Sequence, residues 1–283
     1  MLHWIKHTLF VLPALLAQVP VSQAGAQAES TRTTPALFTY RDVLLAGAVS
    51  AAALLARDAD ERYAKRLQDS STQANRRLHT IATIVRTTTD PGAVIIGLSM
   101  YAGGRVAKNE RFTELGLRGT EALFVGEAIG FTMKGLIGRQ RPYVTPQNSH
   151  RFKFMGGFTG GDEFRSFPSG HTLGAFAAAS AATSATSGWW PGSRWYVGSV
   201  LYGGAALTGF SRMYDNRHWA TDVIVGAGLG TFAGLKVVRY HHANPNTFVD
   251  RWLLNGSLVP SPDGGHSLHW SIMPDIGLSA HRR

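Results

Sequence analysis

The sequence has no cysteine among its 283 residues. This absence excludes disulfides, cysteine-ligated zinc or iron–sulfur clusters, and a thiol nucleophile. Charged residues are scarce at 16%, whereas apolar residues reach 44%, which is enough for a sizeable core. Acidic residues are the rarer charged type: 18 stand against 28 basic residues, for a formal net charge of +10. This balance favours anionic partners such as nucleic acid, membrane headgroups or phosphorylated small molecules.

Long, purely apolar runs are also scarce. A membrane-spanning helix needs about 20 predominantly apolar residues, and the stretches at 43–56, 91–104 and 223–235 are shorter. Residues 172–193 are long enough, but they are rich in small polar residues and contain Pro191. These lengths predict an all-α protein, a packed helical bundle. A bundle embedded in the inner membrane stays an alternative, because small residues also allow close helix packing in membranes.

Residues 1–28 are typical of a secretory signal peptide. Lys6 precedes a short apolar stretch, and Ala24, Ala26 and Ala28 offer cleavage sites of the A-x-A type. We therefore expect cleavage and a periplasmic or secreted protein, with an uncleaved membrane anchor as the alternative.

Three further regions follow. Residues 29–118 are expected to form the N-terminal helices of the bundle, with the charge-dense residues 58–77 as a solvated helix or connector. Residues 119–240 are expected to form its core. Residues 241–283 form a tail, in which alternating apolar residues flank an Asp-Gly pair and predict a β-hairpin. The pair His241-His242 in this tail is interpreted as solvated rather than as a metal site.

Residues 143–167 carry four glycines and little periodicity, which predicts a long loop. Long ordered loops are often functional. Its basic residues Arg151, Lys153 and Arg165 are either contacts for substrate anions or solvated surface charges.

Just before this loop stand Lys134 and Arg141-Pro142. A spacing of seven residues is about two helical turns, so the two cations are expected on one helix face. Pro142 disfavours helix at Arg141, which is therefore expected just past the helix end. Taken alone, the pair also fits two solvated cations.

The loop ends in Pro168-Ser169-Gly170-His171, followed by an Ala-rich run. Ser169 is a candidate N-cap, and Gly170 lets an anion approach the backbone. The N–H groups and dipole of the helix would bind that anion, with His171 beside it in the first turn. An ordinary capped helix with an incidental histidine is the alternative.

A third block contains Ser211-Arg212, His218 and Asp222. Histidine and aspartate four residues apart share a helix face, so the carboxylate can accept a hydrogen bond from one imidazole nitrogen and leave the other as a nucleophile. With Asp215 or Asn216 as the cap, His218 would lie in the first turn, where the helix dipole disfavours its protonation. A structural pair is the alternative.

Together the blocks resemble the signature of the type 2 phosphatidic acid phosphatase (PAP2) superfamily, KxxxxxxRP, PSGH and SRxxxxxHxxxD. Every specified position is present, in the same order. The resemblance covers about residues 119–240. It implies a helical bundle and extends to bacterial acid phosphatases, lipid phosphatases and vanadium haloperoxidases.

The resemblance also implies residue roles. Phosphate oxygens would be bound by cations and by the start of the helix after the loop, namely by Lys134, Arg141, Ser169, Gly170 and Arg212. His218 would attack phosphorus, His171 would protonate the leaving oxygen and then activate water, and Asp222 would orient His218. No cofactor and no metal are implied, since cations and N–H dipoles match the charge of a phosphoryl transition state.

The sequence therefore predicts a metal-independent phosphatase. Its substrate would be a phosphomonoester or diphosphate, either a lipid such as phosphatidate or an isoprenyl diphosphate, or a soluble ester. A membrane surface is a possible partner and nucleic acid is not expected. The alternatives are a vanadium haloperoxidase and a non-catalytic binding protein on the same fold.

Overall fold

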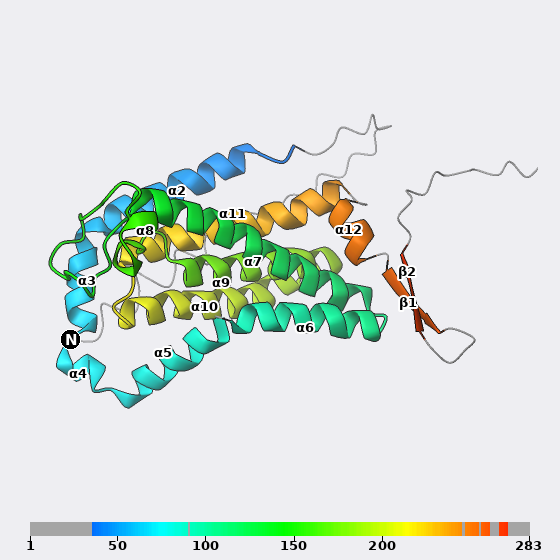
Figure 1. Ribbon diagram of the computed structural model, residues 1–283, viewed down its shortest axis with the longest axis horizontal. Helices are drawn as coiled ribbons and strands as arrows, with labels where there is room; N and C mark the ends of the chain where they lie inside the picture. The colour runs from blue at the N-terminus through cyan, green and yellow to red at the C-terminus, as the bar shows by residue number, and fades with distance from the viewer. Residues whose placement is uncertain (1–35, 90, 245–246, 255, 261–265, 271–283) are drawn as a thin grey trace, which may run out of the picture.

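The computed structural model describes residues 36–89, 91–244, 247–254, 256–260 and 266–270 (Figure 1). The signal peptide expected at residues 1–28 lies outside the described residues. Within them the fold is the expected all-α bundle with a two-stranded C-terminal appendage.

The N-terminal half contains helices of very different length. Short helices and a 3-10 turn connect three longer ones that line the outside of the bundle. They are α2 (Tyr40–Ala56), η1 (Arg57–Ala59), α3 (Asp60–Leu67), α4 (Ser70–Gln73), α5 (Arg76–Thr89) and α6 (Gly92–Val106).

The longest helices follow, separated by the loop with its two short helical turns. They are α7 (Glu110–Ile137), α8 (Gly156–Thr159), η2 (Asp162–Phe164), α9 (Gly170–Trp189), α10 (Ser193–Tyr214), α11 (Ala220–Ala243) and α12 (Phe248–Leu253). Helix α9 lies in the middle and packs against α7, α10 and α11, while α2, α5 and α6 cover α11, α10 and α7 respectively.

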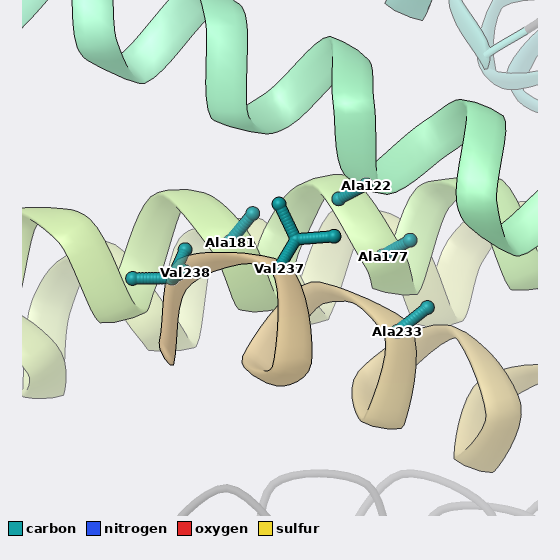
Figure 2. Packing of buried hydrophobic residues seen from close by; sticks show 6 residues of the cluster. All are labelled: Ala122, Ala177, Ala181, Ala233, Val237 and Val238. Carbon is teal, nitrogen blue, oxygen red and sulfur yellow. The ribbon is translucent and has the colours of Figure 1, made fainter. Parts of the chain in front are cut away.

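Small residues bring α7, α9 and α11 close together. The core cluster between them consists of Ala122, Ala177, Ala181, Ala233, Val237 and Val238 (Figure 2). A Cβ atom added at Gly230 would lie 2.1 Å from the carbonyl oxygen of Leu173, and one at Gly234 would lie 2.3 Å from that of Ala177. The backbones of α9 and α11 therefore touch directly, and glycine is required at both positions.

The three sequence blocks meet at one end of the bundle, the end that carries α3 and α8 in Figure 1. There α7 and α10 end, and α9 and α11 begin. Helix α7 ends at Ile137 because Gly138 takes the left-handed conformation, with φ 57°. The loop that follows passes over this end and returns to α9.

At the opposite end, α12 and strands β1 (Gly256–Pro260) and β2 (His266–Trp270) follow α11. The strands pair antiparallel with Leu258 opposite Leu268, which confirms the strands of the predicted hairpin. Its Asp-Gly turn lies outside the described residues.

The expected solvation of His241-His242 is wrong for the first histidine. His241 is buried, with Nε2 2.8 Å from Glu121 Oε1 and Nδ1 3.0 Å from Asp250 Oδ2. Burial alone would lower its pKa, but hydrogen bonds to these two carboxylates raise it. His242 is exposed as expected. His241 thus connects Glu121 of α7 with Asp250 of α12.

Among the described residues, α11 alone is long and apolar enough to cross a membrane, and 61% of its most apolar window is buried in the bundle. Other helices also expose apolar side chains, namely Ile95 and Ile96 on α6 and Phe124 and Phe131 on α7.

We expect Gly230→Ala to destabilise the protein by about 1–3 kcal/mol, because the new methyl group meets a backbone carbonyl that cannot move without shifting α9. The matched control is Gly204→Ala on α10, where a Cβ atom meets nothing within 4 Å. Alanine there should stabilise the helix by up to about 1 kcal/mol. Urea unfolding of both variants measures the difference. Equal stabilities would contradict the backbone contact.

Candidate active site

A cavity of about 710 Å³ opens where the three sequence blocks meet. Its charged and histidine lining comes from α7, the loop, the start of α9, the end of α10 and the α10–α11 turn, and its apolar lining comes from α6 and α7. The charged and histidine side chains are those of Glu127, Lys134, Arg141, Asp162, Arg165, His171, Arg212, Arg217 and His218. The apolar side chains are those of Val94, Leu123, Phe124 and Phe131.

Lys134 lies in the last turn of α7, and its Nζ donates a hydrogen bond to the carbonyl of Pro168. Burial lowers its pKa from 10.5 to about 8, and the positive charge of Arg141 adds to this effect. A Cβ atom at Gly170 would be 3.5 Å from this Nζ, so the cation lies directly beside the first turn of α9.

Lys134, Arg141 and Arg212 together form the cationic floor of the cavity. Arg141 lies past the helix end, as expected, and its NH2 group donates to Asp162 Oδ1 at 2.9 Å. Arg212 lies in the last turn of α10, where its NH1 group donates to Asp215 Oδ2 at 3.0 Å. Its Nε is buried and has no hydrogen-bond partner among the described residues. A buried donor without a partner fits a site for an anion.

The start of α9 lies where the sequence predicts it. Gly170 and His171 form the first turn and line the cavity, and Ser169 is the N-cap residue. However, Ser169 is fully buried, its Oγ pairs with Thr172 Oγ1 at 2.8 Å, and its N–H donates to the carbonyl of Asp222. Ser169 is not among the residues that line the cavity, and its expected contact with phosphate stays a prediction.

His218 presents one defined nitrogen to the cavity. Its Nδ1 is 2.7 Å from the carbonyl oxygen of Ser166, which can only accept, so Nδ1 carries the proton. Nε2 consequently keeps its lone pair. Burial lowers the pKa of His218 to about 3, which leaves the imidazole neutral. The expected place in a first helical turn is wrong: α11 begins at Ala220, and His218 precedes it.

The hydrogen bond expected between Asp222 and His218 is not present. Asp222 Oδ2 is 3.7 Å from His218 Nδ1, too long for a hydrogen bond. Instead Oδ2 accepts from Ser166 Oγ at 2.5 Å and from the N–H of Trp219 at 2.9 Å. The carboxylate thus holds the two segments that carry His218 and its carbonyl partner.

Arg139 holds this arrangement and was missed in the sequence. Its guanidinium lies between two buried carboxylates, with NH1 2.6 Å from Asp222 Oδ1 and NH2 2.7 Å from Asp60 Oδ2. Burial alone would raise the pKa of Asp222, but the charge of Arg139 outweighs it and holds the pKa well below its usual range. The expectation that residues 58–77 are solvated is wrong at Asp60, which is 1% exposed.

Of the three basic loop residues, Arg165 reaches the cavity. Arg151 is exposed, and Lys153 lies over the ring of Phe164. Arg217 also lines the cavity, although it was not singled out in the sequence. Within the described ranges, no group of three or more histidine or acidic side chains is placed to hold a metal ion.

Comparison with known proteins gives one family. Residues 117–246 match the family model of the PAP2 superfamily. A lipid A 1-phosphatase of Porphyromonas gingivalis is 35% identical over 123 residues, which are 40% of this chain and 22% of that protein. The chain thus matches only 22% of the length of this curated relative.

Among solved structures, the chain is similar to a transmembrane PAP2 type phosphatidylglycerolphosphate phosphatase from Bacillus subtilis. The TM-score is 0.48 at 20% identity, and the match covers 74% of this chain and 99% of that one.

Anion binding should weaken as pH rises through about 8. Because the pKa of Lys134 is lowered to about 8, the free protein loses this cation above that pH. We expect any activity in this cavity to show an alkaline fall in kcat/KM near pH 8, since kcat/KM reports the free enzyme. Lys134→Arg should move the fall upward by at least one pH unit, because arginine stays charged. A normalised pH profile that is unchanged in Lys134→Arg would assign the fall to another group.

Replacing Arg139 should strongly reduce the stability of the folded protein. We expect Arg139→Met to cost about 3–5 kcal/mol of unfolding free energy, because it leaves the carboxylates of Asp60 and Asp222 buried without their cation. Arg151→Met, in the same loop but exposed, should change stability by less than about 0.5 kcal/mol. Urea unfolding compares the two, and similar small losses would show that the buried network contributes little.

Proposed function

Because this chain belongs to the PAP2 superfamily, we propose that it is a phosphatase that hydrolyses phosphorylated lipids through a phosphohistidine intermediate. Its similarity to a protein named for a lipid phosphate, lipid A 1-phosphatase, supports this class of substrate.

One observation carries the proposal: the cavity joins a cationic floor to an apolar wall. Lys134, Arg141 and Arg212 suit a phosphate group. Leu123, Phe124 and other apolar residues of the same cavity suit a hydrocarbon chain. A soluble sugar phosphate would use the first set and leave the second in contact with water. A lipid phosphate fills both.

In the proposed first step, phosphate oxygens bind the three cations and the N–H group of Gly170. The dipole of α9, a helix of 20 residues, adds to this attraction. His218 Nε2 then attacks phosphorus with its lone pair, and the phosphorus–oxygen bond to the lipid breaks. The charge that spreads over the phosphoryl oxygens is met by the same cations, so the step uses no metal.

His171 serves both halves of the proposed reaction. It gives a proton to the oxygen that leaves with the lipid, and in the second half it removes a proton from the water that attacks phosphohistidine. Its place in the first turn of α9 puts it beside the bound anion. Asp222 and Arg139 act behind His218, where they keep Ser166 and its carbonyl in place.

The proposed setting is a membrane surface outside the cytoplasm. The exposed rings of Phe124 and Phe131 belong to both the cavity and the outer face of α7. A lipid chain could therefore enter from the bilayer without passing through water.

The test compares two substrates. One is phosphatidate in mixed detergent micelles, and the other is a soluble phosphomonoester such as p-nitrophenyl phosphate. We expect phosphate release from phosphatidate with a kcat/KM at least tenfold higher than from the soluble ester. A preference for the soluble ester would contradict a lipid substrate.

His218→Ala should abolish turnover, and acid-labile, base-stable phosphate should be trapped on the wild type but not on the variant. His242→Ala is the matched control, because this histidine is exposed on α11 away from the cavity, and it should keep full activity. Circular dichroism verifies that both variants fold. Equal trapping on folded His218→Ala would remove His218 from the role of nucleophile.

A further inference from the structure

We propose that the carboxylate of Glu127 accepts a hydrogen bond from His171 and keeps this imidazole protonated, which makes Glu127 a positioning residue for the general acid. The inference rests on the proposed phosphatase function, in which His171 protonates the leaving oxygen. It deepens that function, because Glu127 lies outside the three sequence blocks and has no role in it so far.

A general acid needs its proton before the reaction begins, and much of the surroundings of His171 opposes protonation. The histidine stands in the first turn of α9, where the helix dipole repels a positive charge. The described lining of the cavity also holds five cationic side chains, those of Lys134, Arg141, Arg165, Arg212 and Arg217. A charged imidazole at this place therefore requires a nearby anion.

Three carboxylates around the cavity are directed at arginines. These ion pairs are Asp162 with Arg141 and Arg217, Asp215 with Arg86 and Arg212, and Asp222 with Arg139. Among the described residues, the acidic side chains of the lining are those of Asp162 and Glu127. Asp162 faces the arginines of the loop and of the α10–α11 turn, whereas Glu127 faces α9.

The carboxylate of Glu127 lies directly over the start of α9. A Cβ atom added at Gly170 would be 3.4 Å from its Oε2, and one at Gly174 would be 3.3 Å from its Oε1. His171 is a neighbour of both glycines on the helix surface, where Cβ atoms three or four residues apart are separated by about 5–6 Å. The carboxylate is therefore within reach of the imidazole, which lines the same cavity.

Gly174 leaves room for this carboxylate. Glycine is unfavourable inside a helix, and Gly174 lies within the 20 residues of α9. A Cβ atom there would lie 3.2 Å from Leu123 Cδ2 as well as 3.3 Å from Glu127 Oε1, so a larger residue would crowd both side chains. The glycine thus fits a place where α7 brings an acidic side chain against α9.

Glu127 also acts on Lys134, two helical turns further along α7, and its charge favours the protonated lysine. A loss of activity on replacing Glu127 could therefore come from the lysine or from the histidine. The leaving group separates the two causes. Lys134 would bind phosphate oxygens in every substrate, whereas His171 is needed in the first step only where the leaving oxygen must take up a proton.

The experiment compares p-nitrobenzyl phosphate with p-nitrophenyl phosphate, using the full chain. The two esters are nearly equal in size, but the first releases an alcohol whose oxygen needs a proton, and the second releases a stable phenolate. We expect Glu127→Gln to lower kcat/KM for the benzyl ester about tenfold more than for the phenyl ester at neutral pH. Equal losses for both esters would assign the effect to Lys134 and overturn the inference.

Two further variants complete this comparison. Glu110→Gln, at an exposed glutamate of α7 outside the cavity, should change neither value. In a His171→Ala background, Glu127→Gln should cause no further loss that is specific to the benzyl ester, because the two residues act as a unit. An additional selective loss in that background would contradict action through His171. Circular dichroism verifies the fold of each variant.

Histidine titration by NMR separates this inference from the phosphatase proposal, because it needs no substrate. The signal of His171 is identified by its loss in His171→Gln. We expect its titration midpoint to fall by about one pH unit in Glu127→Gln, since the nearby negative charge is lost, and to stay unchanged in Glu110→Gln. If neither ester is hydrolysed but the midpoint falls, the phosphatase proposal fails and the contact stands. An unchanged midpoint would overturn the contact.

Discussion

The guanidinium of Arg139, buried between Asp60 and Asp222, is the interaction on which the site depends. It joins the start of α3, the segment after α7 and the first turn of α11, which are far apart in the sequence. A buried carboxylate without a cation would take up a proton or draw in water. With Arg139 in place, Asp222 stays ionised and anchors Ser166 and Trp219, and these two residues determine where His218 lies.

Burial determines the protonation of His218, and positive charge dominates the part of the cavity around Lys134. Around His218, burial removes water and keeps the imidazole neutral, which preserves a lone pair on Nε2. Around Lys134, positive charges gather at the start of α9, and the charge of Arg141 contributes to the lowered pKa of the lysine. The neutral base and the cations line the same cavity, so a phosphate held by the cations, as we propose, would lie near the lone pair.

The sequence predicted the all-α fold, the strands of the tail and the meeting of Lys134, Arg141, His171, Arg212 and His218 in one cavity, because these depend on helical periodicity and on motif order. It did not predict the partners of Ser169 and Asp222. Those depend on how the loop returns over the bundle end, which brings the carbonyl of Ser166 to His218. Asp60 gave no signal at all, since a single buried carboxylate in a charge-dense stretch looks like its solvated neighbours.

The backbone contact between α9 and α11 has a consequence for how such a protein can change. His171 stands at the start of one of these helices and His218 just before the other, and glycines let the two helices touch main chain to main chain. Their separation is therefore set by backbone geometry and not by the size of any side chain. Residues of α5 and α6 can be exchanged over generations without altering it, so the apolar lining of the cavity can diverge while the spacing of the two histidines is inherited unchanged.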